Sequence, residues 1–278
     1  MRFIYREWGK LCTTLEKKGI HSISARAVFE LSKEVKYCVL KHDVETNVKK
    51  AYKLAQIENA HGQCGTYYFQ AYLMTEKNMQ FIKAIAALGH EVSYHYDVMD
   101  SNKGDIEKAI VEFEQNKRIF EENGFEIKTV CQHGNPIVER VGYNSNRDFF
   151  RSEKVQKLYP QISDIMVDFY KKANTDYTYI SDAGMGFKVV FDPINNDIAP
   201  SSEKDVSLKD VDAVLDYIEK GNGSFFISTH PHRWTVTVTQ SVIKRFIFKA
   251  VRAIVKVLCK ISFIRKFMAK HYHLAKKL

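Results

Sequence analysis

Strand-like apolar runs alternate with helix-like segments along most of this chain, and this alternation restricts its fold more than any other feature. It predicts an α/β protein in which helices connect the strands of a parallel sheet or barrel. We expect strands at residues 36–41, 66–70, 91–96, 128–132, 176–180, 188–191 and 224–228. We expect helices at residues 47–60, 77–88, 106–122 and 208–219.

Polar residues that can bind metals or transfer protons recur where these strands end. The active sites of α/β sheets and barrels form at the carboxyl ends of their strands. Four separate strand ends carry such residues, which favours one shared site over four coincidences. They are His42-Asp43-Val44-Glu45, His95 with Asp97, His133, and the pair His230 and His232 around Pro231.

Asp43 and Glu45 form the first of these groups. Residues two apart in an extended chain point the same way, so both carboxylates can face one site while His42 faces away. Two neighbouring carboxylates repel each other unless a cation lies between them. One can then bind a metal while the other takes a proton from water. The alternative is that Asp43 or Thr46 caps the helix that begins near residue 47.

The histidines also have two interpretations each. His95 is either a core residue of a tyrosine-rich strand or a ligand that Asp97 orients. Cys131 and His133 lie on one face and can bind zinc, although we favour Cys131 as a buried packing residue. His230 is either a general acid near neutral pH or part of a surface turn.

Charge is distributed unevenly between the body of the chain and its end. Residues 241–278 contain eleven Lys or Arg and no acidic residue, whereas the rest has 31 basic and 33 acidic residues. The body is close to neutral, so we expect no nucleic-acid binding. We also expect no signal peptide and no membrane-spanning helix. The five scattered cysteines predict reduced thiols in the cytosol: Cys12, Cys38, Cys64, Cys131 and Cys259.

Residues 241–270 predict a helix with one basic face and one broad apolar face. This pattern is typical of a helix that lies on an anionic membrane surface. The alternative is a helix that packs on the barrel with its basic face in water. We favour the membrane, at its cytoplasmic face, because a solvated face normally mixes charges of both signs. The basic residues at helical spacing are Arg245, Lys249, Arg252, Lys256 and Lys260.

Six short motifs, in order, resemble the polysaccharide deacetylase family, carbohydrate esterase family 4. More narrowly, the chain is similar to a branch with an HDVD-like first motif, found in bacterial surface-polysaccharide loci. The resemblance covers about residues 36–234. The motifs are LKHDVE (40–45), GTYYF (65–69), GHEVSYH (89–95), QHGNP (132–136), YISDAG (179–184) and STHPHRW (228–234).

The resemblance implies a distorted (β/α)7 barrel at residues 36–240, between an N-terminal helical segment (1–35) and the basic amphipathic helix (241–278). It also implies a divalent metal, usually zinc, held by one carboxylate and two histidines. The metal would polarise an N-acetyl carbonyl and activate water. A separate aspartate would act as base, and a late histidine would protonate the leaving amine.

Asp43 and Glu45 match the acidic first motif of the family. Either Asp43 is the ligand and the usual base is lost, or Asp43 is the base and Glu45 the ligand. Strand geometry favours the second assignment. His95 matches the first metal histidine, and His230 matches the late acid. Asp182 would orient a catalytic group or bind substrate.

The second metal histidine of the family falls at Met99, which is a poor zinc ligand. His133 or Asp97 would have to replace it. The resulting expectation is a metal-dependent hydrolase that removes an N-acetyl group from an amino sugar of a surface polysaccharide or a lipid-linked glycan precursor. The rivals are a hydrolase of another C–N bond, such as a cyclic amide, and a degenerate, non-catalytic carbohydrate-binding module.

Overall fold

Nine strands join into one sheet in the computed structural model, in the order β5-β4-β3-β2-β1-β9-β6-β7-β8. The structure describes residues 2–31, 35–135, 138–173, 176–199, 204–221 and 223–258. The strands are β1 (Cys38–Val44), β2 (Gly65–Phe69), β3 (Glu91–Tyr96), β4 (Thr129–Gln132), β5 (Ser163–Asp164), β6 (Tyr177–Ser181), β7 (Phe187–Val190), β8 (Val206–Leu208) and β9 (Ser224–Thr229).

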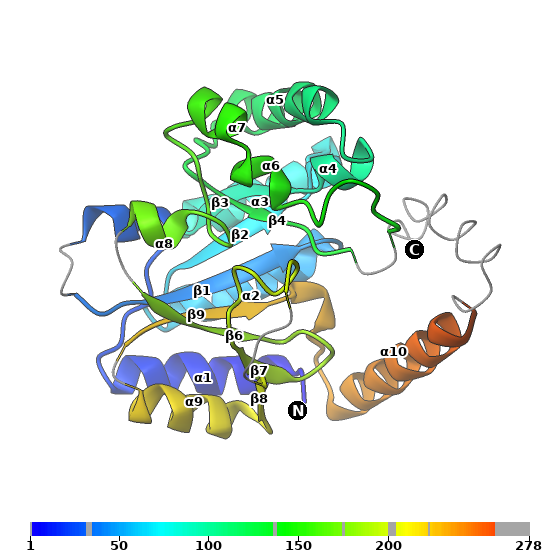
Figure 1. The fold of residues 1–278 in the computed structure, drawn as a ribbon. Helices are drawn as coiled ribbons and strands as arrows, with labels where there is room; N and C mark the ends of the chain where they lie inside the picture. Colours follow the sequence, from blue (N-terminus) through cyan, green and yellow to red (C-terminus); the bar gives the residue numbers. More distant parts are fainter. Residues whose placement is uncertain are drawn as a thin grey trace.

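The seven strands from β5 to β6 run parallel, and β7 and β8 extend the sheet beyond β6 as antiparallel strands. Helices connect the parallel strands, so the predicted α/β class is confirmed (Figure 1). The helices are α1 (Tyr5–Lys17), α2 (Val48–Ala60), α3 (Glu76–Ala87), α4 (Val98–Ser101), α5 (Ile106–Glu122), α6 (Asp148–Arg151), α7 (Glu153–Leu158), α8 (Phe169–Lys172), α9 (Val211–Lys220) and α10 (Val238–Leu258). Three short 3₁₀ turns are η1 (Arg26–Glu30), η2 (Ala71–Leu73) and η3 (Pro231–Arg233).

The parallel strands curve around a shared interior, and side chains bridge the gap between β5 and β6. The Tyr177 hydroxyl donates to the Ile165 carbonyl at 2.6 Å, and the Tyr177 ring contacts that of Phe169. The interior cluster joins side chains from opposite strands, including Tyr68 and Phe226. Seven parallel strands that close through side chains, with no backbone ladder between β5 and β6 in the described residues, form the distorted (β/α)7 barrel that the motifs implied.

Two further apolar clusters fill the space between the sheet and its outer helices. One lies under α2, α3 and α5, and the other joins α1 and α9 to β1, β9 and β7. Trp8, Leu11 and Leu15 are the buried stripe of α1, at the spacing of one helical face. Figure 1 shows α1 beside α9 on one side of the sheet and α5 on the other. The N-terminal helix is therefore part of the layer that covers the barrel.

The predicted strands and helices are present, with ends that shift by at most three residues. The alternative interpretation, in which Asp43 or Thr46 caps α2, is wrong. α2 is preceded by Asn47, whose left-handed backbone (φ 52°) makes the turn without a side-chain cap hydrogen bond. β1 continues through Val44, so Asp43 belongs to the strand and its side chain is available to the barrel interior.

The last described helix, α10, covers the first half of the predicted C-terminal helix. Residues 259–278, which include Cys259 and Lys260, lie outside the described residues. Cys12, Cys38, Cys64 and Cys131 are free cysteines. Within the described ranges, every helix is too short or too polar to cross a bilayer.

Candidate metal-binding active site

Side chains from four strand ends meet at the carboxyl edge of the barrel. Asp43 is in β1, and Glu45 is the first residue after this strand. His95 is in β3, His133 follows β4, and His230 follows β9. β2 pairs in parallel with both β3 and β1, and β9 pairs in parallel with the other edge of β1, which fixes the relative heights of these residues. The structure brings these five of the residues singled out in the sequence close together.

Glu45, His95 and His133 form the group best suited to a metal. Their ligand atoms lie within 4.8 Å of one another. Glu45 Oε1 is 3.1 Å from His133 Nε2 and 3.9 Å from His95 Nε2. Both imidazoles are buried, and Glu45 is partly exposed. One carboxylate oxygen and two imidazole nitrogens are three protein donors of the kind found in catalytic zinc sites.

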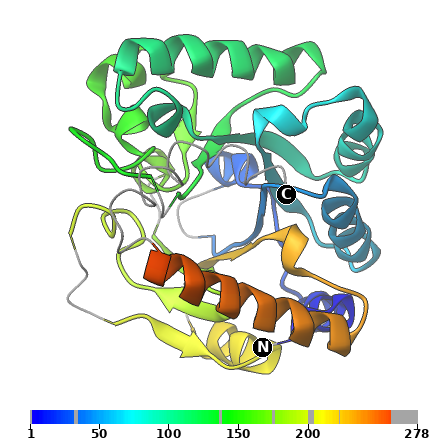
Figure 2. The same ribbon diagram turned by 90° about the vertical axis from the view of Figure 1, so that its right-hand side faces the viewer.

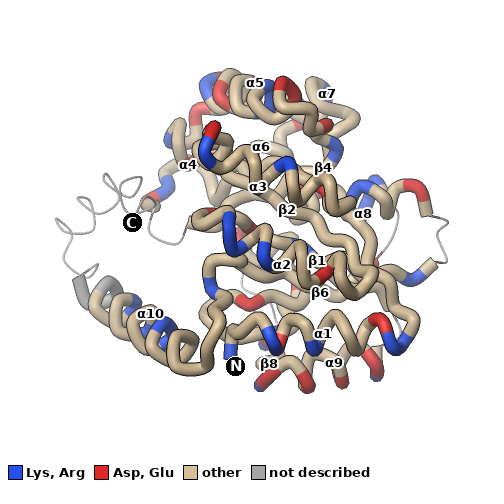
Figure 3. Tube along the Cα trace, turned by 180° about the vertical axis from the view of Figure 1, so that it is seen from behind, with Lys and Arg blue, Asp and Glu red and all other residues tan. Residues whose placement is uncertain are grey.

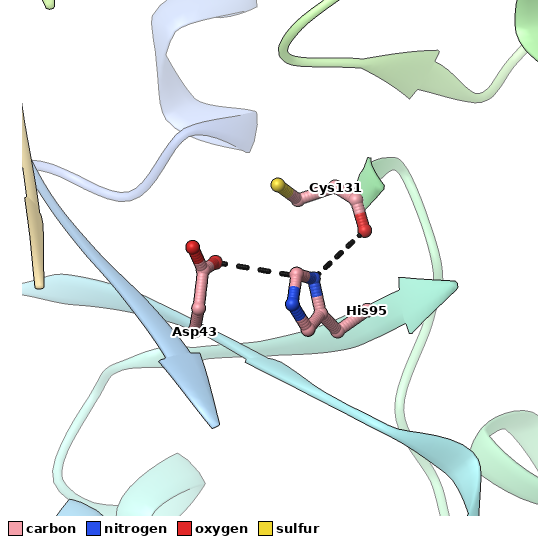
Figure 4. A group of neighbouring side chains, drawn as sticks. All are labelled: Asp43, His95 and Cys131. Carbon is pink, nitrogen blue, oxygen red and sulfur yellow. Dashed lines mark hydrogen bonds and ion pairs between the residues drawn. The ribbon is translucent and has the colours of Figure 1, made fainter. Parts of the chain in front are cut away.

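His95 is oriented so that one ring nitrogen remains for this group. Its Nδ1 lies 3.0 Å from the Cys131 carbonyl oxygen, which can only accept, so Nδ1 carries the proton (Figure 4). Nε2 is therefore the lone-pair nitrogen, and it is buried without a hydrogen-bond partner. A metal-binding histidine commonly has this arrangement, in which a carbonyl fixes the tautomer. The unpaired buried Nε2 is the structural observation that fits a metal ion.

A second group, Asp43 with His95 and Cys131, has ligand atoms equally close together. It is the weaker candidate because His95 Nδ1 is already hydrogen-bonded to the carbonyl. Burial raises the pKa of the Cys131 thiol well above its usual value. Cys131 belongs to the apolar cluster inside the barrel, which supports its interpretation as a packing residue.

Asp43 is held by a buried lysine that sequence reasoning missed. Lys41 Nζ lies 2.6 Å from Asp43 Oδ2, 3.1 Å from the Tyr179 hydroxyl and 3.3 Å from Ser228 Oγ. Burial alone would raise the pKa of Asp43, but the charges of Lys41, His95 and His230 outweigh it and lower the pKa. Asp43 is therefore charged, and its Oδ1 has no hydrogen-bond partner. The signal in the sequence was a lone cation two residues before the acid, on the same face of an apolar strand.

His230 is oriented by Asp182. Asp182 directly follows β6 and His230 directly follows β9, and these two strands are paired. His230 Nδ1 lies 2.7 Å from Asp182 Oδ1, so Nδ1 donates to the carboxylate. This leaves Nε2 facing the site, 3.6 Å from Glu45 Oε1 and 3.9 Å from Asp43 Oδ2. A nitrogen held between these groups can exchange a proton with a reacting molecule.

Asp182 is itself fully buried and well supplied with donors. It accepts from Thr229 Oγ1 at 2.7 Å, from the His230 backbone at 3.0 Å and from Arg233 Nη1 at 2.6 Å. Burial would raise the pKa of Asp182, but Arg233 and His230 lower it well below the usual value. Asp182 therefore remains charged and fixes the His230 ring. Thr229 and Arg233 were not identified from the sequence.

Met99 and Asp97 contribute no atom to either candidate ligand group of the described residues. Met99 is buried in the apolar cluster under α5, and Asp97 precedes α4. His133 and Asp97 were the two residues expected to replace the second metal histidine. The structure places His133, and not Asp97, beside Glu45. The reason is that β4 is paired with β3, which sets Cys131 beside His95 and carries His133 to the edge of the barrel.

His42 points away from the site, as the alternation along β1 predicts. Its Nε2 lies 2.8 Å from the fully buried Glu58 carboxylate on α2. Glu58 also accepts from Trp8 Nε1 and the Tyr67 hydroxyl, each at 2.8 Å. This outer network fixes α1, α2 and β2 against the strand that carries Asp43.

No family model matches the chain, and no curated protein sequence matches it significantly. Among solved structures, the chain is similar to a CE4 esterase from Streptococcus mutans, with 13% identity, coverage of 85% of this chain and 90% of that one, and a TM-score of 0.44. It is also similar to a family 4 carbohydrate esterase from Streptomyces lividans, with 14% identity, coverage of 80% and 91%, and a TM-score of 0.39.

A third similar structure is a CE4 family pseudoenzyme from Bacillus anthracis, with 12% identity and a TM-score of 0.41. That match covers 79% of this chain and 62% of the pseudoenzyme. The chain likewise spans only 64% of a mutant CE4 pseudoenzyme with restored activity. These proteins belong to the family that the sequence motifs resemble. With TM-scores below 0.5, the similarities by themselves assign no activity to this chain.

Proposed function

We propose that the protein is a metal-dependent hydrolase that removes an N-acetyl group from an amino sugar of a surface polysaccharide or a lipid-linked glycan precursor. One observation carries the proposal. Glu45, His95 and His133 converge at one point, and the charged Asp43 and the oriented His230 flank it. A ligand group between a base and an acid is the arrangement needed to hydrolyse an amide. The motif resemblance supplies the substrate class.

Glu45, His95 and His133 are the residues that would hold the metal, and zinc suits their donor set. When bound, a divalent metal at this site would polarise the N-acetyl carbonyl and lower the pKa of a bound water. The protein fixes the tautomer of His95 through the Cys131 carbonyl. It fixes the charge of Glu45 as well: burial would raise its pKa, but His133 and His230 lower it well below the usual value.

Asp43 acts as the base. Its Oδ2 is occupied by Lys41, so Oδ1 takes the proton from the attacking water while the hydroxyl adds to the acetyl carbon. The Lys41 ammonium remains in place throughout, because it is buried and its pKa is raised well above the usual value: burial lowers it, but the charge of Asp43 outweighs burial.

His230 acts as the acid. The bond between the acetyl carbon and the sugar nitrogen breaks, and the nitrogen takes a proton from Nε2 to leave as the free amine. The acetyl group leaves as acetic acid, which gives its proton to the released amine or to water, and the proton on Asp43 restores the histidine. Asp182 stays charged and stabilises the imidazolium through Nδ1.

Acetate release tests this function. The purified full chain is treated with a chelator, reloaded with zinc, cobalt or nickel, and incubated with N-acetylated amino-sugar oligomers and lipid-linked sugars. We expect acetate only from the reloaded protein, and none from Asp43→Asn. Binding of the same glycans without acetate release from any metal form would contradict the proposal and indicate a non-catalytic binding module.

A further inference from the structure

Six apolar side chains on α10 form an unpartnered surface, here named the α10 stripe. Each is more than half exposed, and Phe246 reaches 73%. The other side of the helix packs against the barrel. Ser241 Oγ accepts a hydrogen bond from the Phe3 backbone N–H at 2.9 Å, and Phe248 packs against the core. A continuous apolar surface on a helix is a mark of an interaction site. The stripe consists of Val242, Ile243, Phe246, Ile247, Val251 and Ile254.

The charge of α10 indicates what kind of surface covers this stripe. In the sequence, residues 238–258 contain five basic residues and no acidic one. The coloured part of α10 in Figure 3 carries blue segments and no red one. An apolar partner protein would need acidic residues to match, whereas an anionic lipid surface matches both the apolar stripe and the cations. The basic residues are Lys244, Arg245, Lys249, Arg252 and Lys256.

Beside the stripe, two lysines from different elements converge without an anion between them. Lys50 Nζ on α2 donates to the His232 carbonyl at 3.2 Å and to the Trp234 carbonyl at 2.6 Å. Lys244 Nζ on α10 donates to the same His232 carbonyl. In the part of the chain that the structure describes, neither ammonium forms an ion pair with a carboxylate. Two cations that share one neutral acceptor repel each other, and an anion between them would relieve the repulsion.

The lysines lie in a groove of about 500 Å³ that is continuous with the stripe. Its apolar wall is formed by Tyr5, Val236, Ile243 and Ile247, and the last two belong to the stripe as well. A second groove, of about 460 Å³ on α5, differs because it mixes Lys108 with Glu107 and Glu112. Of these two grooves in the described residues, the first combines unopposed positive charge with an apolar wall, which matches the phosphate and acyl chains of a phospholipid.

We propose that the α10 stripe lies in the surface of an anionic membrane, and that the phosphate of one lipid is bound between Lys50 and Lys244 with its acyl part along Ile243 and Ile247. The cations of α10 then lie in the headgroup layer. This binding goes beyond the proposed deacetylase function and does not depend on turnover.

Membrane binding of this kind sets the position of the candidate active site. The His232 carbonyl accepts hydrogen bonds from Lys50 and Lys244. The His232 ring contacts the His230 ring, with centroids 5.7 Å apart. Figure 2, which looks onto the right-hand side of Figure 1, shows α10 in front of the sheet. The turn η3 therefore separates the lipid groove from the catalytic histidine, and a sugar joined to a membrane lipid would reach the site from the bilayer surface.

Vesicle sedimentation with the full chain tests the proposal. Vesicles of phosphatidylcholine alone are compared with vesicles that also contain phosphatidylglycerol. We expect strong binding to the second kind only. The double variant Lys50→Gln with Lys244→Gln should bind about 30-fold more weakly, at about fivefold per charge. Phe246→Ser should weaken binding as well, because it removes apolar contact.

Matched variants separate a lipid site from general attraction. Lys53→Gln with Lys108→Gln removes the same charge at exposed positions and should keep most of the binding. Lys50→Arg with Lys244→Arg should keep it too, and Val111→Ser on α5 is the control for Phe246→Ser. Equal losses in the Lys50/Lys244 and Lys53/Lys108 glutamine variants would overturn the proposal.

Two other occupants of the surface give distinct results. If the wild-type protein binds neither kind of vesicle but its melting temperature rises with inorganic phosphate, the groove binds a free anion and the proposal is wrong. If wild type ignores vesicles and sediments as a dimer that Phe246→Ser dissociates, the stripe binds a second copy, and the proposal is likewise overturned.

Discussion

Lys41 and Asp43 form a fully buried ion pair on one face of β1, with Nζ 2.6 Å from Oδ2. The pair holds the Asp43 carboxylate 3.9 Å from His95 Nδ1 and from His230 Nε2, and it leaves Oδ1 without a hydrogen bond. It explains how a carboxylate can stay ionised inside the barrel, and it supports Asp43 as the proposed base although the first motif has a histidine at position 42. The pair is the feature that distinguishes this site from one with two adjacent aspartates.

Lys41→Met should destabilise the protein by about 3–5 kcal/mol, because Asp43 is left as an unpaired buried charge. It should also lower kcat by about 100-fold, because Lys41 no longer holds the Asp43 carboxylate in place. Urea unfolding and acetate release measure the two effects. Adding Asp43→Asn to Lys41→Met should restore much of the stability but none of the activity. Lys10→Met, at the exposed pair with Asp212, should change stability by less than about 1 kcal/mol.

Asp182→Asn should lower kcat on the order of 10²- to 10⁴-fold while the metal content stays unchanged, because His230 loses its orienting acceptor. The free energy of unfolding of the metal-free protein, measured as a function of pH, gives a second test that does not depend on metal. The pKa of Asp182 is depressed in the folded state, so its stabilising contribution is present above the unfolded pKa of about 4 and is lost as the pH falls further. Wild type should therefore lose stability in acid more steeply than Asp182→Asn. Equal slopes would show that Asp182 is not held charged.

Glu58→Gln should destabilise the protein by about 3–5 kcal/mol, because the carboxylate is fully buried against His42, Trp8 and Tyr67. Glu16→Gln is the matched control, since Glu16 forms an exposed pair with His61 at 3.0 Å. That control should change the free energy of unfolding by less than about 0.5 kcal/mol. Urea titration measures both, and equal values would contradict a structural role for the outer network.

The strands that carry the site could be predicted from the sequence because their apolar runs are long. The alternation along β1 was enough to place Asp43 and Glu45 on one side and His42 on the other. β5 and β8 have only two and three residues, too few for a periodic pattern to show. Their existence depends on pairing with β4 and β7, which is a property of the assembled sheet.

The supporting residues of the site were harder to predict because their partners lie far apart in the chain. Arg233 contacts Asp182 from 51 residues away, and Lys41 meets Tyr179 from 138 residues away. The choice of His133 over Asp97 required the register between β3 and β4. Sequence spacing finds residues that share a strand, whereas contacts between strands appear only when the barrel closes.

The metal content of the purified full chain, measured by elemental analysis, tests the central claim most directly. Wild type should hold about one zinc or similar ion. His95→Ala and His133→Ala should lose it, whereas Cys131→Ala should keep it, because the thiol belongs to the packing of the barrel. Wild type that takes up no metal after incubation with zinc, cobalt and nickel would contradict the hydrolytic site. Loss of metal from Cys131→Ala together with retention in His133→Ala would place the ion at the other group of ligands.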